Sequence, residues 1–197
     1  MPYPSYKTED DPNKTEGSSN SGFTGCSISI KKDLILRGKV TLPATGTYKN
    51  EKGQEITASV ITIPSNFGDG QKITHLFCEK ENSKILEIGA NAFSNCWAYY
   101  DPNSGYQISC FKYFDFTPNT VRFVDTGAFT NCELDAKIYS DPKYGLSSRM
   151  FYVGVDAFNK AFSSSTDSNV TLYIPGEVRY ANAGSFANQY IQQGWTL

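Results

Sequence analysis

A short phrase recurs along this chain, and it constrains the fold more than any other feature. In each copy a hydrophobic run is followed by a small residue, a phenylalanine and a polar turn. Two clear copies occupy residues 85–96 and 121–132, a third occupies 151–158, and a degenerate fourth occupies 178–186. Repeats of a few tens of residues indicate stacked units, each of which buries its apolar face only against its neighbours. Stacks of this kind usually present a binding surface and seldom enclose a catalytic pocket.

Short apolar segments that end in proline interleave with these phrases. Their residues are β-branched or aromatic at alternate positions, which predicts strands, and a proline cannot donate the next ladder hydrogen bond. The expected strands lie at residues 27–30, 39–42, 58–63, 113–117, 136–141 and 169–174. Turn-rich insertions between some of these segments predict that the repeats differ in length.

The strand, the proline and the Ala-Phe turn together resemble the BspA-like leucine-rich repeats, whose phrase is approximately Ile-x-Ile-Pro-x-x-Val-x-x-Ile-Gly-x-x-Ala-Phe-x-x-Cys. Residues 85–96 match the second half of this phrase, and residues 117–132 match nearly all of it. The resemblance covers roughly residues 56–197, with an opening repeat at 61–73 and a closing cap within 172–197. It implies a β-rich leucine-rich-repeat solenoid, a right-handed coil of short parallel strands with few short helical turns and about four to five irregular repeats.

The composition divides the chain into three parts. Residues 1–25 are rich in Pro, Ser, Asn, Gly, Lys and Glu, which is typical of a flexible linker or arm. Residues 26–55 match the repeat poorly, and we expect them to form an N-terminal β cap that shields the first coil. Residues 56–197 form the expected solenoid, with its C-terminal cap beginning at residue 172.

Equivalent side chains of successive copies should form columns in such a stack. The expected inward aromatic column consists of Phe93, Phe129, Phe158 and Phe186. Cys96 and Cys132 each follow their phenylalanine by three residues, and Ala161 takes this place in the third copy. Because alanine can replace a small buried filler but not a metal ligand or a redox partner, we expect these cysteines to be structural.

Little in the sequence indicates catalysis or a cofactor. The single histidine, His75, has no Gly-x-Ser-x-Gly motif to accompany it, so a solvent-facing strand histidine is the preferred interpretation. The five cysteines are an odd number without a C-x-x-C pair, which excludes a complete disulfide framework and zinc-ligand spacing. Gly68-Asp-Gly70 is interpreted as a hairpin turn. We therefore expect no enzyme activity, no cofactor and no bound metal.

Charge and hydropathy narrow the expected partners. A formal net charge of −2 argues against a nucleic-acid ligand, which would need a basic patch or stripe. Spanning a bilayer takes about 20 consecutive apolar residues, and no run in the chain approaches that length, so we expect no membrane insertion. The first residues contain no recognisable signal peptide. We nevertheless expect an extracellular or cell-surface location, with an export signal that is not present in this chain.

The aromatic residues allow two interpretations. They pack one coil against the next, or some of them form a tyrosine-rich contact surface, because tyrosine gives a large contact area at a low entropy cost. Strand alternation turns about half of such rings toward the outer face of a sheet. The candidate ligand-binding residues on that face are Tyr113, Asp115, Tyr139 and Tyr173.

Two hypotheses about function follow. The first is a non-enzymatic surface or secreted binding module that recognises a protein or glycan partner, and the resemblance implies an adhesion or host-contact role. The alternative is a structural component of a larger assembly, such as a virion or surface layer, tethered by the arm at residues 1–25. The sequence leaves the ligand and the oligomeric state open.

Overall fold

The protein is rich in β-strands that pair mainly in parallel. The computed structural model describes residues 25–31, 33–79, 82–96, 99–100, 107–108, 111–135, 146–147, 149–162, 171–173, 178, 180–185 and 192–194. No helix occurs in these ranges, so the short helical turns expected from the resemblance are not found in the described part of the chain.

The strands are short after the first third of the chain. In order they are β1 (Gly25–Ser27), β2 (Arg37–Leu42), β3 (Thr45–Lys49), β4 (Glu55–Ile63), β5 (Lys72–Cys78), β6 (Glu87–Ile88), β7 (Tyr99–Tyr100), β8 (Gln107–Ile108), β9 (Tyr113–Phe114), β10 (Phe123–Val124), β11 (Tyr152–Val153), β12 (Thr171–Tyr173), β13 (Tyr180–Ala181) and β14 (Gln192–Gly194). The segments expected at 39–42, 58–63, 113–117 and 169–174 all contain observed strands, whereas the one expected at 136–141 lies outside the described residues. The strand expected at 27–30 is wrong, because only Ser27 belongs to a strand, at the end of β1.

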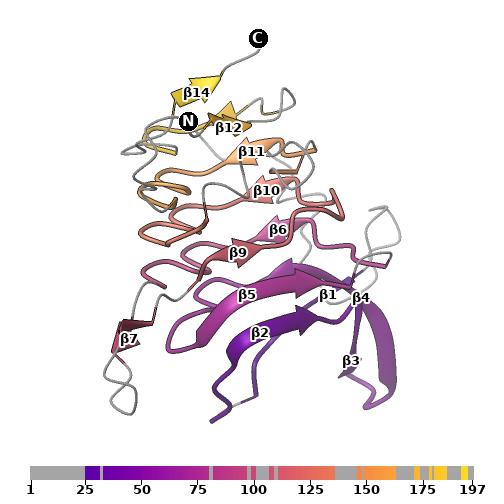
Figure 1. Ribbon diagram of the computed structural model, residues 1–197. Helices are drawn as coiled ribbons and strands as arrows, with labels where there is room; N and C mark the ends of the chain where they lie inside the picture. The colour runs from indigo at the N-terminus through magenta and orange to yellow at the C-terminus, as the bar shows by residue number, and fades with distance from the viewer. Residues whose placement is uncertain are drawn as a thin grey trace.

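The largest sheet has seven strands, and six of them follow chain order, β1-β4-β6-β10-β11-β13. All five pairings along this path are parallel, while β3 pairs in antiparallel fashion with the first half of β4. Parallel neighbours need a crossover connection, so the chain leaves the sheet and returns to it between successive strands. Figure 1 shows these strands rising in order from the indigo end of the molecule toward the yellow end.

A second parallel sheet, in the order β2-β5-β9, contains strands that alternate along the chain with those of the first. Two smaller pairs, β12-β14 and β7-β8, complete the described strands. The turn at Gly68-Asp-Gly70 joins β4 to β5, which belong to different sheets. The predicted hairpin is therefore wrong, because this turn carries the chain from one sheet to the other.

One register position of the main sheet forms the inner wall of the core. Ile63, Ile88, Val124 and Val153 are paired in successive strands, and each is fully buried. Burying one such side chain contributes about 1.5–3 kcal/mol relative to leaving it in water. The two-residue strands β6, β10 and β11 are thus held by a continuous apolar column as well as by their few ladder hydrogen bonds.

The predicted aromatic column is confirmed for three of its four members. The rings of Phe93 and Phe129 stack with centroids 5.4 Å apart, and those of Phe129 and Phe158 stack at 5.1 Å. All three side chains are fully buried, whereas Phe186 lies outside the described residues. Offset stacking adds about 0.5–1.5 kcal/mol per pair beyond the area buried.

Three Ala-Phe turns and the turn at Phe67 each contain two residues in the left-handed region, four positions apart. The first position is taken by Asn66, Asn91, Gly127 and Asp156, and the second by Gly70, Asn95, Asn131 and Lys160. Gly184 holds the first position in the degenerate copy, whose second position lies outside the described residues. Asparagine, aspartate and glycine tolerate this conformation best, which explains most of these residue types. The side chains also connect neighbouring copies, because Nδ2 of Asn131 donates a 2.9 Å hydrogen bond to Oδ1 of Asn95.

The two cysteines of the repeated phrase, Cys96 and Cys132, form hydrogen bonds between neighbouring copies. The Cys132 thiol donates to the carbonyl oxygen of Phe93 at 2.9 Å, and the Cys96 thiol donates to that of Gly68 at 3.6 Å. In both cases the acceptor lies in the preceding copy, and Ala161 is fully buried at the third position. The structural role predicted for these two cysteines agrees with this arrangement.

Candidate binding surface

The outer face of the β2-β5-β9 sheet brings aromatic and charged residues into one row. Lys39 of β2 is paired with His75 of β5, which is paired in turn with Tyr113 of β9. Residues two positions further along β2 and β5, Thr41 and Phe77, form the next row. The three strands lie side by side in Figure 1, and the inward residues between these rows fill the core.

An irregularity in β5 determines which side chains reach this face. Gly38 is paired with Ile73, but the next residue of β2, Lys39, is paired with His75, so Thr74 is an extra residue. Both Ile73 and Leu76 are buried, three positions apart instead of the two expected for a regular strand. A bulge of this kind redirects the side chains that follow it, and here it places His75 on the outer face.

Three rings on this face form a contiguous cluster. The imidazole of His75 stacks on Phe77 with centroids 6.2 Å apart and an interplanar angle of 8°, and it lies 6.1 Å from the ring of Tyr113. Phe77 and Tyr113 complete the triangle at 5.3 Å. His75 and Phe77 are half-buried, whereas Tyr113 is only 8% exposed. We call His75, Phe77 and Tyr113 the ring cluster.

The charges around His75 come from three segments. Burial lowers the pKa of His75 below its ordinary 6.5, and the ammonium groups of Lys39 and Lys112 lower it further. Asp135 acts in the opposite direction but more weakly. The imidazole is therefore neutral at pH 7, and the field of the surrounding charges at His75 is positive.

The Asp115 carboxylate holds the Tyr113 ring of the ring cluster in place through hydrogen bonds. Its Oδ1 accepts hydrogen bonds from the Tyr113 hydroxyl at 3.1 Å, from the Thr117 backbone N–H at 3.0 Å and from the Thr117 hydroxyl at 2.5 Å. Its Oδ2 accepts a longer bond of 3.5 Å from the backbone N–H of Cys78. The side chain is 2% exposed, so these donors take the place of water around the carboxylate.

The Cys78 thiol, at the end of β5, lies next to Asp115 and is protonated at neutral pH. Burial raises the pKa of Cys78 to about 12, and the nearby Asp115 carboxylate adds to this shift. The thiol donates a 3.7 Å hydrogen bond to the main-chain carbonyl of Asp115. Because the thiolate is the nucleophilic form, Cys78 is an inert part of the core.

The structure brings together two of the four predicted ligand-binding residues. Tyr113 and Asp115 lie on the expected face, but both are buried, which corrects the prediction that they project outward into solvent. Their hydrogen bond to each other and the packing of Phe77 against the Tyr113 ring explain the burial. Tyr139 lies outside the described residues. Tyr173 belongs to β12, whose described partner is β14, and its side chain also lies outside the described part.

Sequence reasoning did not connect His75 and Phe77 with the candidate surface. The alternation of His75 and Phe77 within one strand indicates that they share a face, but this pattern does not show that Tyr113 is their neighbour. That pairing depends on the parallel register between β5 and β9, two strands that lie far apart in the sequence.

A second set of rings lies on the main sheet. Phe151 contacts Phe123 at 6.3 Å and Tyr180 at 5.1 Å, and the Arg122 guanidinium lies 5.8 Å from the centre of the Phe123 ring. Tyr180 is 47% exposed. This set provides an exposed aromatic surface on the same molecule, with which the ring cluster can be compared experimentally.

The comparisons with known proteins add no assignment. The chain matches no protein-family model, no curated protein and no solved structure. Within the described ranges, no three His, Cys, Asp or Glu side chains gather closely enough to hold a metal ion. Among these same residues, no helix is long and apolar enough to cross a membrane.

Proposed function

We propose that this chain is a non-enzymatic binding module, built as a short leucine-rich-repeat solenoid that is secreted or displayed at a cell surface. It recognises a protein or glycan partner through the outer face of the β2-β5-β9 sheet. The observation that carries this proposal is the ring cluster, in which half-buried His75 and Phe77 rest on a Tyr113 ring that is fixed by Asp115.

The arrangement of the ring cluster suits binding better than catalysis. A catalytic carboxylate needs an accessible oxygen, yet both oxygens of Asp115 already accept hydrogen bonds within the protein. The Cys78 thiol, which contacts Asp115, stays protonated well above neutral pH. Rigid, partly exposed rings lose little side-chain entropy when they are covered, which favours a contact surface.

The solenoid part of the proposal rests on the repeated phrase and on the way its copies pair. The four copies of the repeated phrase contain the parallel strands β6, β10, β11 and β13, which are neighbours in chain order. Backbone hydrogen bonds also join the turns themselves, for example from the Phe93 N–H to the Ala128 carbonyl and from the Phe129 N–H to the Ala157 carbonyl. Nearest-neighbour contacts of this kind are typical of repeat proteins.

A steric block on the outer face tests the proposal. Thr41 is exposed and lies beside Phe77, so Thr41→Trp would cover the ring cluster without removing a buried group. Thr47→Trp on the exposed side of β3 is the matched control. Against immobilised panels of glycans and extracellular-matrix proteins, we expect Thr41→Trp to lose at least tenfold in affinity for whatever the native protein binds. The proposal fails if both variants bind like the native protein or if the native protein binds nothing.

A further inference from the structure

We propose that the ring cluster and its flanking lysines form a site for an acidic oligosaccharide, whose sugar faces lie on the rings while its anionic groups meet Lys39 and Lys112. This inference rests on the proposed function, because it assumes that the outer face of β2-β5-β9 is a binding surface. It goes further by naming one class of ligand and the role of each group in the site.

The charge of the site favours an anion. Lys39 and Lys112 are both exposed and lie on either side of His75, one on β2 and the other just before β9. Their combined effect on the imidazole is greater than that of Asp135, the third charged neighbour. Asp115, on the Tyr113 side, is buried and has its oxygens occupied by hydrogen bonds. The whole chain carries a net charge of −2, so the positive field on this face does not come from the overall charge of the protein. It is a local property of the face.

The size and shape of the site favour a sugar over a folded protein. Strands lie about 4.8 Å apart, so the row from Lys39 of β2 through His75 of β5 to Tyr113 of β9 is roughly 10 Å wide, a width that two sugar rings can cover. A stable protein interface buries about 800 Å² on each partner, which is several times the area that three rings offer. The C–H faces of a sugar ring pack on aromatic faces, and carboxylate or sulfate groups at its edge would reach the ammonium groups.

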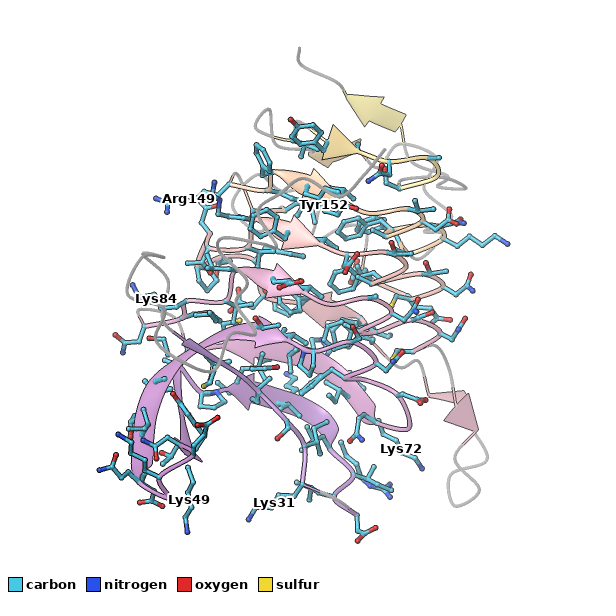
Figure 2. The ribbon with its side chains drawn as sticks, turned by 180° about the vertical axis from the view of Figure 1, so that it is seen from behind. Lys31, Lys49, Lys72, Lys84, Arg149 and Tyr152 are labelled. Carbon is cyan, nitrogen blue, oxygen red and sulfur yellow. The ribbon has the colours of Figure 1, made fainter. Side chains whose placement is uncertain are left out.

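The basic character continues along the same strands. Arg37 of β2 and Lys72 of β5 are paired with each other in the row that precedes the bulge. Lys49 lies on the β3-β4 hairpin instead, and Figure 2 shows Lys49 and Lys72 on opposite sides of the lower end of the molecule. A longer acidic chain could therefore extend from the ring cluster toward Arg37, while Lys49 provides a lysine outside the site.

The test measures binding of three octasaccharides to the full chain at 50 mM and 300 mM NaCl. Hyaluronan carries carboxylates only, chondroitin sulfate carries carboxylates and sulfates, and a chitin fragment is neutral. We expect at least one acidic sugar to bind tenfold or more tightly than the neutral one, and its affinity to fall with salt. The two acidic arms decide whether carboxylate or sulfate is the preferred group.

Two pairs of variants identify the site. Lys39→Glu with Lys112→Glu reverses the flanking charges, and Lys49→Glu with Lys52→Glu makes the same change in net charge on the exposed hairpin. We expect the first pair to weaken acidic-sugar binding at least tenfold and the second at most twofold. Equal losses in both pairs would mean unspecific attraction and would overturn the proposal.

A third pair of variants measures how much the Phe77 ring contributes to sugar binding. Phe77→Leu keeps an apolar side chain but removes a ring from the site, and Tyr180→Leu removes an exposed ring from the other sheet. With thermal midpoints measured to establish folding, we expect fivefold or greater weakening only for Phe77→Leu. If no sugar binds while the protein panel shows binding that Thr41→Trp abolishes, the sugar inference is wrong and the binding-module proposal stands.

Discussion

The Tyr113 hydroxyl donates a 3.1 Å hydrogen bond to Oδ1 of Asp115, and this contact fixes the ring on which Phe77 rests. Because Asp115 also accepts two bonds from Thr117, the carboxylate ties the end of β9 to the turn that follows it. The ring cluster is therefore supported by a buried hydrogen-bond network, so its geometry is set before any ligand arrives.

Removing this carboxylate should destabilise the protein. Asp115→Ala removes the acceptor of two buried donors, the Tyr113 hydroxyl and the Cys78 N–H, and each such loss costs about 1–3 kcal/mol. We expect urea unfolding to show a decrease of at least 2 kcal/mol in the free energy of unfolding, by this reasoning. Asp69→Ala, at an exposed aspartate, is the control and should stay within about 0.5 kcal/mol. Equal stability of the two variants would contradict the support role of Asp115.

The central phenylalanine of the stacked column should be the most sensitive core position. Phe129 lies between Phe93 and Phe158 and also contacts three further rings, so Phe129→Ala removes five ring contacts and leaves a cavity. Phenylalanine-to-alanine changes in a core cost about 3–5 kcal/mol, and Phe129→Leu should cost clearly less. Val155→Ala, at a residue 42% exposed, is the matched surface change. Chemical unfolding that ranks Val155→Ala as the most damaging would refute the column.

The backbone conformation of one turn favours glycine. Gly70 has a φ of 67°, and a Cβ there would meet nothing within 4 Å. It occupies the turn position that Asn95 and Asn131 hold in the next two copies. Gly70→Ala should therefore lower the free energy of unfolding by about 1–2 kcal/mol, because a side chain is strained in this conformation even where the space is open. Gly70→Asn should cost less, since asparagine tolerates the left-handed region better. Urea unfolding of both variants measures the difference, and equal losses would contradict it.

The single histidine gives a direct test of the charges on the outer face. Its pKa is lowered in the folded protein, so between that value and 6.5 the unfolded chain binds more protons than the folded one. Stability contributed by His75 is thus present above pH 6.5 and is lost as the pH falls below it. NMR titration of the imidazole should give a pKa below 6.5, and Lys39→Gln should raise it. A pKa at or above 6.5 in the native protein would contradict the positive field.

Thiol reactivity should follow burial. Cys96 is half-buried, whereas Cys78 is buried and has a pKa of about 12. In native protein treated with iodoacetamide at pH 8, peptide mass spectrometry should show that Cys96 is alkylated well before Cys78. The order should disappear in urea, where both thiols are exposed and the pKa of Cys78 returns to its ordinary value. Faster native labelling of Cys78 would show that β5 opens readily.

The strand-rich character of the fold and its parallel pairing could be predicted because a hydrophobic phrase recurs in the sequence. The recurrence of the phrase predicted parallel strands and the stacking of Phe93, Phe129 and Phe158, since equivalent positions in parallel neighbours face the same way. The turn at Gly68-Asp-Gly70 was misjudged, because glycines report a change of direction but not which sheet the chain enters next.

The candidate site was predicted less well because it depends on register between distant strands. Tyr113 and Asp115 were found from alternation, but their burial follows from the contact with Phe77 and from their own hydrogen bond. The position of His75 depends on the extra residue Thr74, which no periodic pattern reveals. Local sequence thus predicted the strands, whereas the composition of the outer face required the three-dimensional pairing.

The extra residue in β5 has a consequence for how such a surface can change over generations. Deleting Thr74 would restore regular alternation with Ile73 and Leu76 still facing inward and His75 and Phe77 still facing outward. The main sheet, whose ladder does not include β5, would keep its own pairing. A single codon gained or lost at this point would therefore be absorbed by the bulge, leaving both the outer face and the rest of the scaffold in place.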